Sequence, residues 1–162
     1  MSSKTGVVDD IVQVGLVVRD AAATAIQYKE LLGVGPWFLN EIDTQGGKGA
    51  NFHHRGQPIK ARARIAWCRF GNVELELIEP LDQDSAYAEF LRDRGPGIHH
   101  LMLGCADYAA AERHMLQAGF TELAGGELQQ TRFKLFDTRE SLGMICEIAS
   151  GGELTPDGTL AD

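Results

Sequence analysis

The sequence lacks the features that identify membrane-spanning and nucleic-acid-binding proteins. It has no run of roughly 18 uninterrupted apolar residues, the length that a membrane-spanning helix needs. It also has no basic run, because 15 Lys and Arg stand against 23 Asp and Glu and give a net charge of -8. Lys and Arg supply most of the affinity for phosphate backbones. We therefore expect neither nucleic acid nor a membrane as a partner.

Cysteine is also scarce, and its placement excludes a disulfide scaffold. The chain has 3 cysteines, which stand singly in apolar segments and form no CxxC pair. An odd number of isolated cysteines is typical of reduced, buried thiols. Residues 1–10 are polar and end in two aspartates, unlike a signal peptide. These features predict a cytoplasmic protein.

The composition is typical of one globular domain, or of two small units that share a core. The 162 residues are 44% hydrophobic and 23% charged, which argues against disorder. Periodicity and turn residues predict the elements of the first half. These are a strand at 11–18, a helix at 21–32, a strand at 36–43, a mobile glycine-rich loop at 44–58, and strands at 59–70 and 73–80.

The same order of elements recurs after a break. A helix at 84–94 and the turn Gly95-Pro96-Gly97 are expected to link the two halves. The second half then has the hydrophobic pattern of a strand, a helix and three further strands. Their expected bounds are 98–105, 108–118, 120–128, 131–137 and 144–149.

The two halves also match in register. Asp20 follows Gln13 by seven positions (20 − 13), and Asp107 follows His100 by the same seven (107 − 100). Each aspartate stands at an expected helix N-cap, and a glycine ends each expected helix. We therefore predict an α+β protein with two copies of one β-α-β-β-β unit. The predicted organisation is a first module at 10–80, a linking helix and turn at 81–97, a second module at 98–150 and a flexible tail at 151–162.

Strand alternation places metal-binding types of side chain on the faces turned away from the helices. An amide, an imidazole and two carboxylates occupy equivalent positions of the two modules: Gln13, His100, Glu76 and Glu147. This donor set suits Zn, Mn, Co, Ni or Fe as a divalent ion. An antiparallel sheet with one solvated face shows the same alternation, so each residue alone is more often solvated. Their joint placement favours one bound metal ion.

Several segments resemble the vicinal oxygen chelate superfamily, which includes glyoxalase I, methylmalonyl-CoA epimerase, fosfomycin-resistance proteins and extradiol dioxygenases. They are VQVGLVVRD, ELLG, VELELIEPL, GIHHLM and MICEIAS, and the resemblance covers about residues 10–150. It implies that the two modules form a U-shaped, mostly antiparallel sheet of eight strands around a metal. It also implies that the metal is held by Gln13, Glu76, His100 and Glu147.

The resemblance points to more than one branch of the superfamily. The first ligand position is commonly His but is Gln13 here, and the Gln/Glu/His/Glu set is similar to the eukaryotic type of glyoxalase I. Extradiol dioxygenases use two histidines and one carboxylate, so Gln13 argues against oxygen chemistry on iron. The segments GIHHLM and LIEPL are closer to the epimerase branch.

A metal site of this kind predicts an enzyme that removes a proton next to a carbonyl, as an isomerase, epimerase or lyase. Glu147 is the preferred base and Glu76 the second choice. The expected substrate is a small carbonyl or carboxylate compound, and a thioester is one such compound. If Ile65 and Trp67 face the helix, Arg62 and Arg64 point into the cavity, where one of them binds a substrate carboxylate or phosphate. Edge-strand charges at the mouth of the cavity are an equally good interpretation of the two arginines.

Two other functions remain open at this point. One is a glyoxalase-type lactoylglutathione lyase, which acts on a thiol adduct and depends on glutathione. The other is a non-catalytic protein that binds small molecules, although such members of the superfamily usually lack the ligand set. The resemblance alone also suggests a homodimer.

Overall fold

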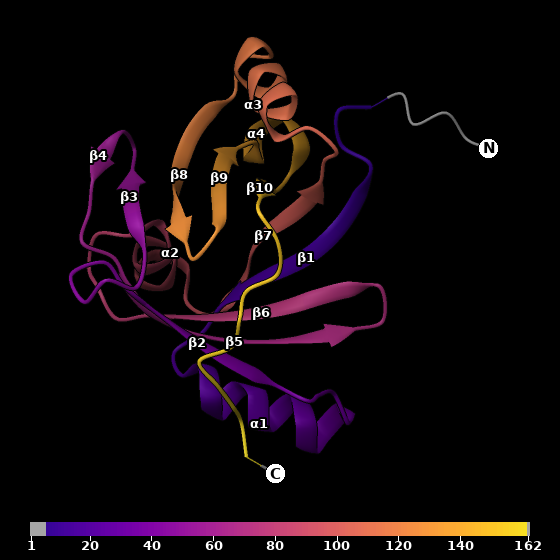
Figure 1. Cartoon of the computed structure of the whole chain (residues 1–162), viewed down its shortest axis with the longest axis vertical. Helices are drawn as coiled ribbons and strands as arrows, with labels where there is room; N and C mark the ends of the chain where they lie inside the picture. The colour runs from indigo at the N-terminus through magenta and orange to yellow at the C-terminus, as the bar shows by residue number, and fades with distance from the viewer. Residues whose placement is uncertain (1–5, 162) are drawn as a thin grey trace.

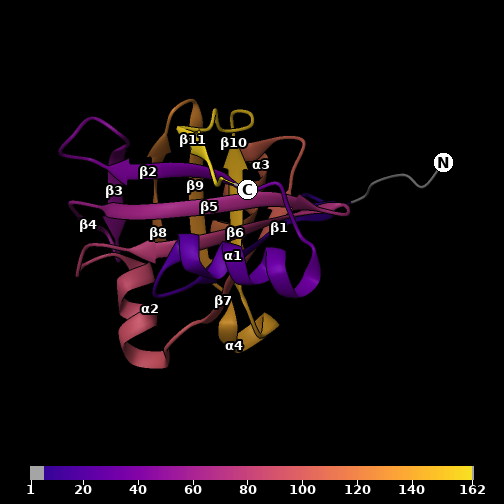
Figure 2. The ribbon, with the colours of Figure 1, turned by 90° about the horizontal axis from the view of Figure 1, so that it is seen from below.

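The described strands join one sheet, which curls strongly but stays open (Figures 1 and 2). The structure is a computed structural model that describes residues 6–161. Part of the predicted polar N-terminus, residues 1–5, and the last residue of the predicted tail lie outside the described residues. The sheet has 11 strands in the order β11-β2-β5-β6-β1-β7-β10-β9-β8-β3-β4.

The first half of the chain follows the expected order, with a hairpin inserted. The hairpin, β3 and β4, lies between the second and third expected strands. The bounds are β1 (Asp10–Val17), α1 (Ala21–Leu32), β2 (Phe38–Asp43), β3 (Ala50–His54), β4 (Gln57–Pro58), β5 (Arg62–Phe70) and β6 (Val73–Pro80).

The second half repeats this order after a linking helix. A short helix, α4, separates its last two long strands and is not predicted from the sequence. The bounds are α2 (Ala86–Arg94), β7 (Gly97–Gly104), α3 (Tyr108–Gln117), β8 (Thr121–Leu128), β9 (Thr131–Asp137), α4 (Arg139–Leu142), β10 (Ile145–Ser150) and β11 (Gly158–Thr159).

The strand pairing is the same on the two sides of the sheet centre. β1 and β7 pair antiparallel there. β1 pairs in parallel with β6, and β7 pairs in parallel with β10. Further outward, each side continues with antiparallel partners, β5 and β2 on one side and β9 and β8 on the other. The sheet has 11 strands rather than the expected eight because β3, β4 and β11 extend its two ends.

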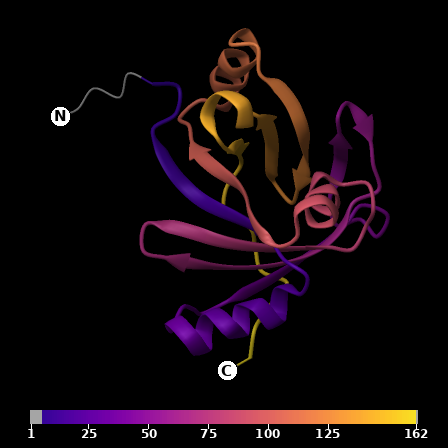
Figure 3. The same cartoon turned by 180° about the vertical axis from the view of Figure 1, so that it is seen from behind.

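The helices α1 and α3 cover outer faces at opposite ends of the molecule (Figures 1 and 3). Each begins as predicted, because Asp20 Oδ1 accepts a hydrogen bond from the Ala23 N–H (2.8 Å) and Asp107 Oδ1 accepts one from the Ala110 N–H (2.9 Å). α1 ends at Gly33 in the left-handed conformation. None of the helices within residues 6–161 is long and apolar enough to cross a membrane.

The glycine-rich stretch at 44–58 forms a hairpin, and the expectation of a mobile loop is wrong for β3 and β4. β3 pairs with β8 of the second half, where His53 lies opposite Gly125. Close approach depends on Gly126, because a Cβ there would lie 2.6 Å from the Phe52 ring. Local composition does not predict this hairpin because its partner strand is distant in the sequence and is itself glycine-rich.

The tail beyond residue 150 also contacts the fold, which the sequence does not predict. β11 pairs with β2, with Gly158 opposite Leu39. The Asn40 side-chain amide donates to the Thr155 carbonyl at 2.8 Å. Figure 1 shows this segment running from β10 to β2, so it joins the second half of the chain to the first.

Candidate functional site

A cavity of about 410 Å³ lies between the two halves of the chain. Much of its wall is apolar, with Ile65, Trp67 and Phe133 from β5 and β9. The segment at 150–154, which follows β10, also lines it. The cavity is therefore built from both modules and partly covered by the segment that joins them.

The four residues expected to hold a metal meet beside this cavity: Gln13, Glu76 and Glu147 line it, and His100 is buried next to them. His100 Nε2 is 2.8 Å from Glu147 Oε2, 3.4 Å from Gln13 Oε1 and 3.7 Å from Glu76 Oε2. His100, Gln13 and Glu147 are all buried. The structure thus brings together an imidazole, an amide and two carboxylates from distant parts of the chain, which range from residue 13 to residue 147.

Two β-bulges position the side chains at the centre of the sheet. The pairing of β1 with β7 shifts register between Ile11 and Gln13, and again between Gly15 and Leu16. The first shift leaves Val12 as the extra residue beside Gln13, and the second leaves His99 as the extra residue beside His100. A bulge redirects neighbouring side chains toward one face of a sheet. Val12 consequently lines the cavity next to Gln13, which simple alternation does not predict.

The site holds an excess of buried acid. Burial, together with the charge of Glu147, raises the pKa of Glu76 to about 8. Burial also raises the pKa of Glu74, against the effect of a hydrogen bond from Gln13 Nε2 (2.7 Å). Burial disfavours the charged imidazole of His100, but the Glu147 and Glu76 carboxylates outweigh it and raise the His100 pKa. A bound cation would relieve the repulsion among these carboxylates.

The donor set fits a divalent ion in type, and its spacing is close to that of metal ligands. Ligands about 2.1 Å from one ion lie about 3 to 3.4 Å apart at neighbouring positions. The 3.4 Å from His100 Nε2 to Gln13 Oε1 falls in this range, whereas the distances to Glu147 (2.8 Å) and Glu76 (3.7 Å) lie on either side of it. Within residues 6–161, no three His, Cys, Asp or Glu side chains have the arrangement of a formed metal site. An ion bound here would separate Glu147 from His100 Nε2, which contact each other directly.

Two further cavity residues complete the site, and the sequence analysis selects neither of them. Glu74 lines the cavity beside Glu76 and accepts the hydrogen bond from Gln13. Its alternation with Glu76 places it on the inner face, so a signal is present in the sequence. Tyr87, from α2, lines the cavity with its ring centroid 6.4 Å from that of His100. Nothing in the sequence indicates this position for Tyr87, because the pattern there predicts only a linking helix.

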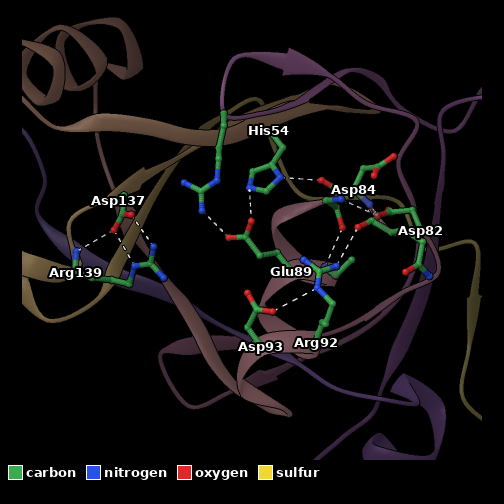
Figure 4. A network of polar contacts seen from close by, with 12 residues as sticks. His54, Asp82, Asp84, Glu89, Arg92, Asp93, Asp137 and Arg139 are labelled. Atoms are coloured by element: carbon green, nitrogen blue, oxygen red, sulfur yellow. Dashed lines mark hydrogen bonds and ion pairs between the residues drawn. The ribbon is translucent and has the colours of Figure 1, made fainter.

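A polar network fixes the helix that carries Tyr87 (Figure 4). His54 and Arg55 of the β3–β4 hairpin both reach Glu89 on α2, with Arg55 Nη2 2.6 Å from Glu89 Oε1. His54 Nδ1 also lies 2.8 Å from the Asp84 carbonyl, just before the helix. The inserted hairpin thereby anchors α2.

Arg62 and Arg64 lie on the opposite face of β5 from the cavity. The expectation that they point inward is wrong because Ile65 and Trp67 line the cavity instead of facing the helix. Arg64 contacts Glu79 at 3.2 Å and is largely exposed. Arg69, further along β5, is the one arginine or lysine among the described residues that line the cavity.

A family comparison agrees with this architecture. The sequence model of the Glyoxalase/Bleomycin resistance protein/Dioxygenase superfamily matches residues 12–134. The chain belongs to this superfamily. The resemblance to vicinal oxygen chelate proteins is therefore confirmed, and the matched residues include three of the four converging side chains, Gln13, Glu76 and His100.

Among characterised relatives in this superfamily, the chain is similar to an ethylmalonyl-CoA/methylmalonyl-CoA epimerase of Cereibacter sphaeroides. The two are 27% identical over 115 residues, which cover 70% of this chain and 74% of that protein. The uncharacterised protein YqjC of Bacillus subtilis is 39% identical over 57 residues, which is 35% of this chain. That match spans only 41% of YqjC.

Solved structures from the superfamily share the fold. Methylmalonyl-CoA epimerase from Mycobacterium tuberculosis superposes with a TM-score of 0.67 at 22% identity and covers 93% of each chain. A variant of the Streptomyces coelicolor epimerase, bound to 2-nitronate-propionyl-CoA, also gives 0.67 at 20% identity. The superposition covers 90% of this chain and 99% of that one. These likenesses establish a common architecture.

Proposed function

We propose that the chain is a metal-dependent enzyme that removes and returns a proton on the carbon next to a carbonyl, as an isomerase or epimerase. The observation that carries this proposal is the convergence of Gln13, Glu76 and Glu147 on His100 Nε2 at the wall of a mostly apolar cavity. The family membership and the relationship to an ethylmalonyl-CoA/methylmalonyl-CoA epimerase support it.

In this proposal, Gln13, Glu76, His100 and Glu147 hold one divalent ion. When bound, the ion supplies a Lewis acid that stabilises negative charge developing on a carbonyl oxygen. The donor set suits Zn, Mn, Co, Ni or Fe equally. The excess of buried carboxylate at the site is the feature of this chain that favours a cation there.

The proton transfer itself is assigned to carboxylates of the chain. Glu147 is the preferred base because its Oε2 lies 2.8 Å from His100 and it lines the cavity. Glu76 is the second choice. An epimerase also needs a second acid to return the proton to the other face of the carbon. We assign this role to Glu74, a third carboxyl group on the cavity wall.

The substrate class follows from the wall of the cavity. Ile65, Trp67 and Phe133 suit the apolar part of a small acyl group and exclude water from the reacting carbon. Arg69 replaces Arg62 and Arg64 as the residue proposed to bind a substrate carboxylate. Methylmalonyl-CoA, which the related epimerases bind, combines a carbonyl with such a carboxylate and is the first compound to test.

Solvent exchange at the substrate carbon tests this function directly. Methylmalonyl-CoA is incubated in deuterated water with the metal-loaded chain, and loss of the α-proton signal is followed by NMR. We expect exchange with the wild type and a decrease of about 10²- to 10⁴-fold for Glu147→Gln, the usual contribution of a general base. Unchanged exchange in Glu147→Gln would contradict the assigned base.

A glyoxalase-type lyase is a second candidate because the first ligand is Gln13, as in the eukaryotic type of glyoxalase I. Conversion of the glutathione adduct of an α-ketoaldehyde, with no exchange on methylmalonyl-CoA, would favour this candidate. Tight binding of either compound without turnover and without metal would instead indicate a non-catalytic binding protein.

A further inference from the structure

His99 lies directly behind His100 and has no role in the function described so far. The residue is only 4% exposed. It packs against two rings of α2, with its centroid 5.1 Å from that of Tyr87 and 5.1 Å from that of Phe90. The bulge at His99 brings its Nδ1 to 3.0 Å from Nδ1 of His100, with the two rings nearly perpendicular at 86°.

The contact between the two Nδ1 atoms requires one donor and one acceptor. A neutral imidazole carries a single N–H and presents a lone pair on its other nitrogen. One hydrogen therefore lies between the two nitrogens. If His99 supplies it, His100 Nδ1 is the acceptor; if His100 supplies it, His99 Nδ1 is the acceptor.

The role of His100 Nε2 decides the direction of this bond. In the proposed function, the lone pair of His100 Nε2 binds the metal ion, so the single N–H of a neutral His100 is on Nδ1. This N–H faces His99 Nδ1, 3.0 Å away. His99 Nδ1 therefore presents a lone pair, and the hydrogen between the rings belongs to His100.

We propose that His99 is a positioning residue that holds the Nδ1–H tautomer of His100. His100 donates its Nδ1–H to His99 Nδ1, and its Nε2 faces Gln13, Glu76 and Glu147. The inference rests on the proposed function in one respect, that His100 Nε2 is a metal ligand.

A neutral imidazole suits this position better than a carboxylate would. Metal-binding histidines usually donate their second N–H to a carboxylate, a carbonyl or water, which fixes the ring and its tautomer. Here the site already contains Glu74, Glu76 and Glu147, and a further buried carboxylate would add repulsion. His99 accepts the hydrogen bond without adding charge.

The tautomer is measurable without activity. ¹⁵N NMR of the labelled, Zn²⁺-loaded full chain distinguishes protonated from unprotonated ring nitrogens. We expect His100 to carry hydrogen on Nδ1 and His99 to have an unprotonated Nδ1. A protonated Nδ1 on His99 would overturn the proposal, and this readout does not depend on whether the protein is an enzyme.

A matched pair of variants separates the acceptor from the ring. Asn and Leu have similar shapes and both remove the ring contacts, but only Asn offers an oxygen near the position of Nδ1. In calorimetric titrations with Zn²⁺, we expect His99→Leu to weaken binding about 10- to 100-fold, the usual effect of losing such a partner. His99→Asn should recover most of that loss. Equal losses in both variants would overturn the proposal.

A third variant controls for packing. Phe90→Leu removes a ring that packs against His99 but leaves His99 Nδ1 in place. We expect it to lower thermal stability while leaving Zn²⁺ affinity within about threefold of wild type. If the wild type binds Zn²⁺ but His99 Nδ1 is protonated, this inference fails while the metal proposal stands. A wild type that binds no Zn²⁺ contradicts the proposed function, and this inference with it.

Discussion

Gly15 lies directly opposite His100 in the antiparallel pairing of β1 and β7, and the imidazole occupies the space that a side chain at Gly15 would need. A Cβ built on Gly15 would be 2.1 Å from His100 Cε1 and 2.3 Å from Nε2. The ring cannot retreat without disturbing His99, whose Nδ1 contacts it from the other side. The absence of a side chain at residue 15 is therefore part of the site.

We predict that Gly15→Ala displaces the His100 ring. It should abolish metal binding, measured by calorimetry, and lower the free energy of unfolding by about 1–3 kcal/mol because of overpacking. Gly97→Ala is the matched control in the same strand pair, because its added Cβ would be 4.0 Å from the nearest atom, Phe90 Cζ. Wild-type metal affinity in Gly15→Ala would show that the ring position does not matter.

The arginines of β5 should differ in their effect on substrate binding. Arg69 lines the cavity, whereas Arg62 and Arg64 lie on its outer side. We predict that Arg69→Ala raises KM for methylmalonyl-CoA about tenfold, the result of losing one charged hydrogen bond. Arg62→Ala and Arg64→Ala should leave KM within about twofold. A larger effect at either outer arginine than at Arg69 would reverse the assignment.

Asn40 should couple the cavity wall to the C-terminal segment. Its Oδ1 accepts a hydrogen bond from Trp67 Nε1 (2.7 Å), and its Nδ2 donates to the Thr155 carbonyl (2.8 Å). Asn40→Ala leaves both partners unpaired, so we predict a loss of about 1–3 kcal/mol in unfolding free energy. Tryptophan fluorescence should shift to the red as Trp67 gains contact with water. No change in either quantity would argue against this coupling.

The acid stability of the fold should depend on Glu122. Burial disfavours its charge, but hydrogen bonds from Lys134 (3.0 Å) and His53 outweigh burial and lower the Glu122 pKa. Because the folded pKa lies below the unfolded value of about 4.3, this contribution is complete above that value. It is lost as the pH falls through the folded pKa.

Glu122→Gln should therefore flatten the decline of stability in acid, measured by urea unfolding between about pH 7 and about pH 3. Glu127→Gln, on the same strand but more exposed, is the control and should retain the wild-type decline. An unaltered pH dependence in Glu122→Gln would mean that the contacts with Lys134 and His53 contribute nothing to it.

Much of the sheet and the grouping of the side chains around His100 could be predicted because they follow from local patterns. Aspartate caps and glycine stops mark both long helices, and alternation in β6 and β10 separates Leu75 from Glu76 and Cys146 from Glu147. Each of these patterns involves residues that are close together in the chain, so a single sequence is enough to recognise it.

The features that local patterns miss depend on contacts between distant segments. A bulge inserts His99 into the pairing with β1, and nothing in GIHHLM reveals it. The direction of Arg64 depends on which face of β5 meets α1, which only the packing of Ala66 and Cys68 decides. The hairpin at 50–58 needs Gly126 of β8, and β11 needs β2.

The most direct test of the account is the metal content of the chain purified without chelator and reloaded with Mn²⁺, Co²⁺, Ni²⁺ or Zn²⁺. Mass spectrometry of the protein after gel filtration should find about one divalent ion per chain in the wild type, the stoichiometry of a single closed set of ligands. His100→Ala should retain none. A wild type that stays free of metal under all these conditions, or a His100→Ala variant that binds as well, would contradict the central claim.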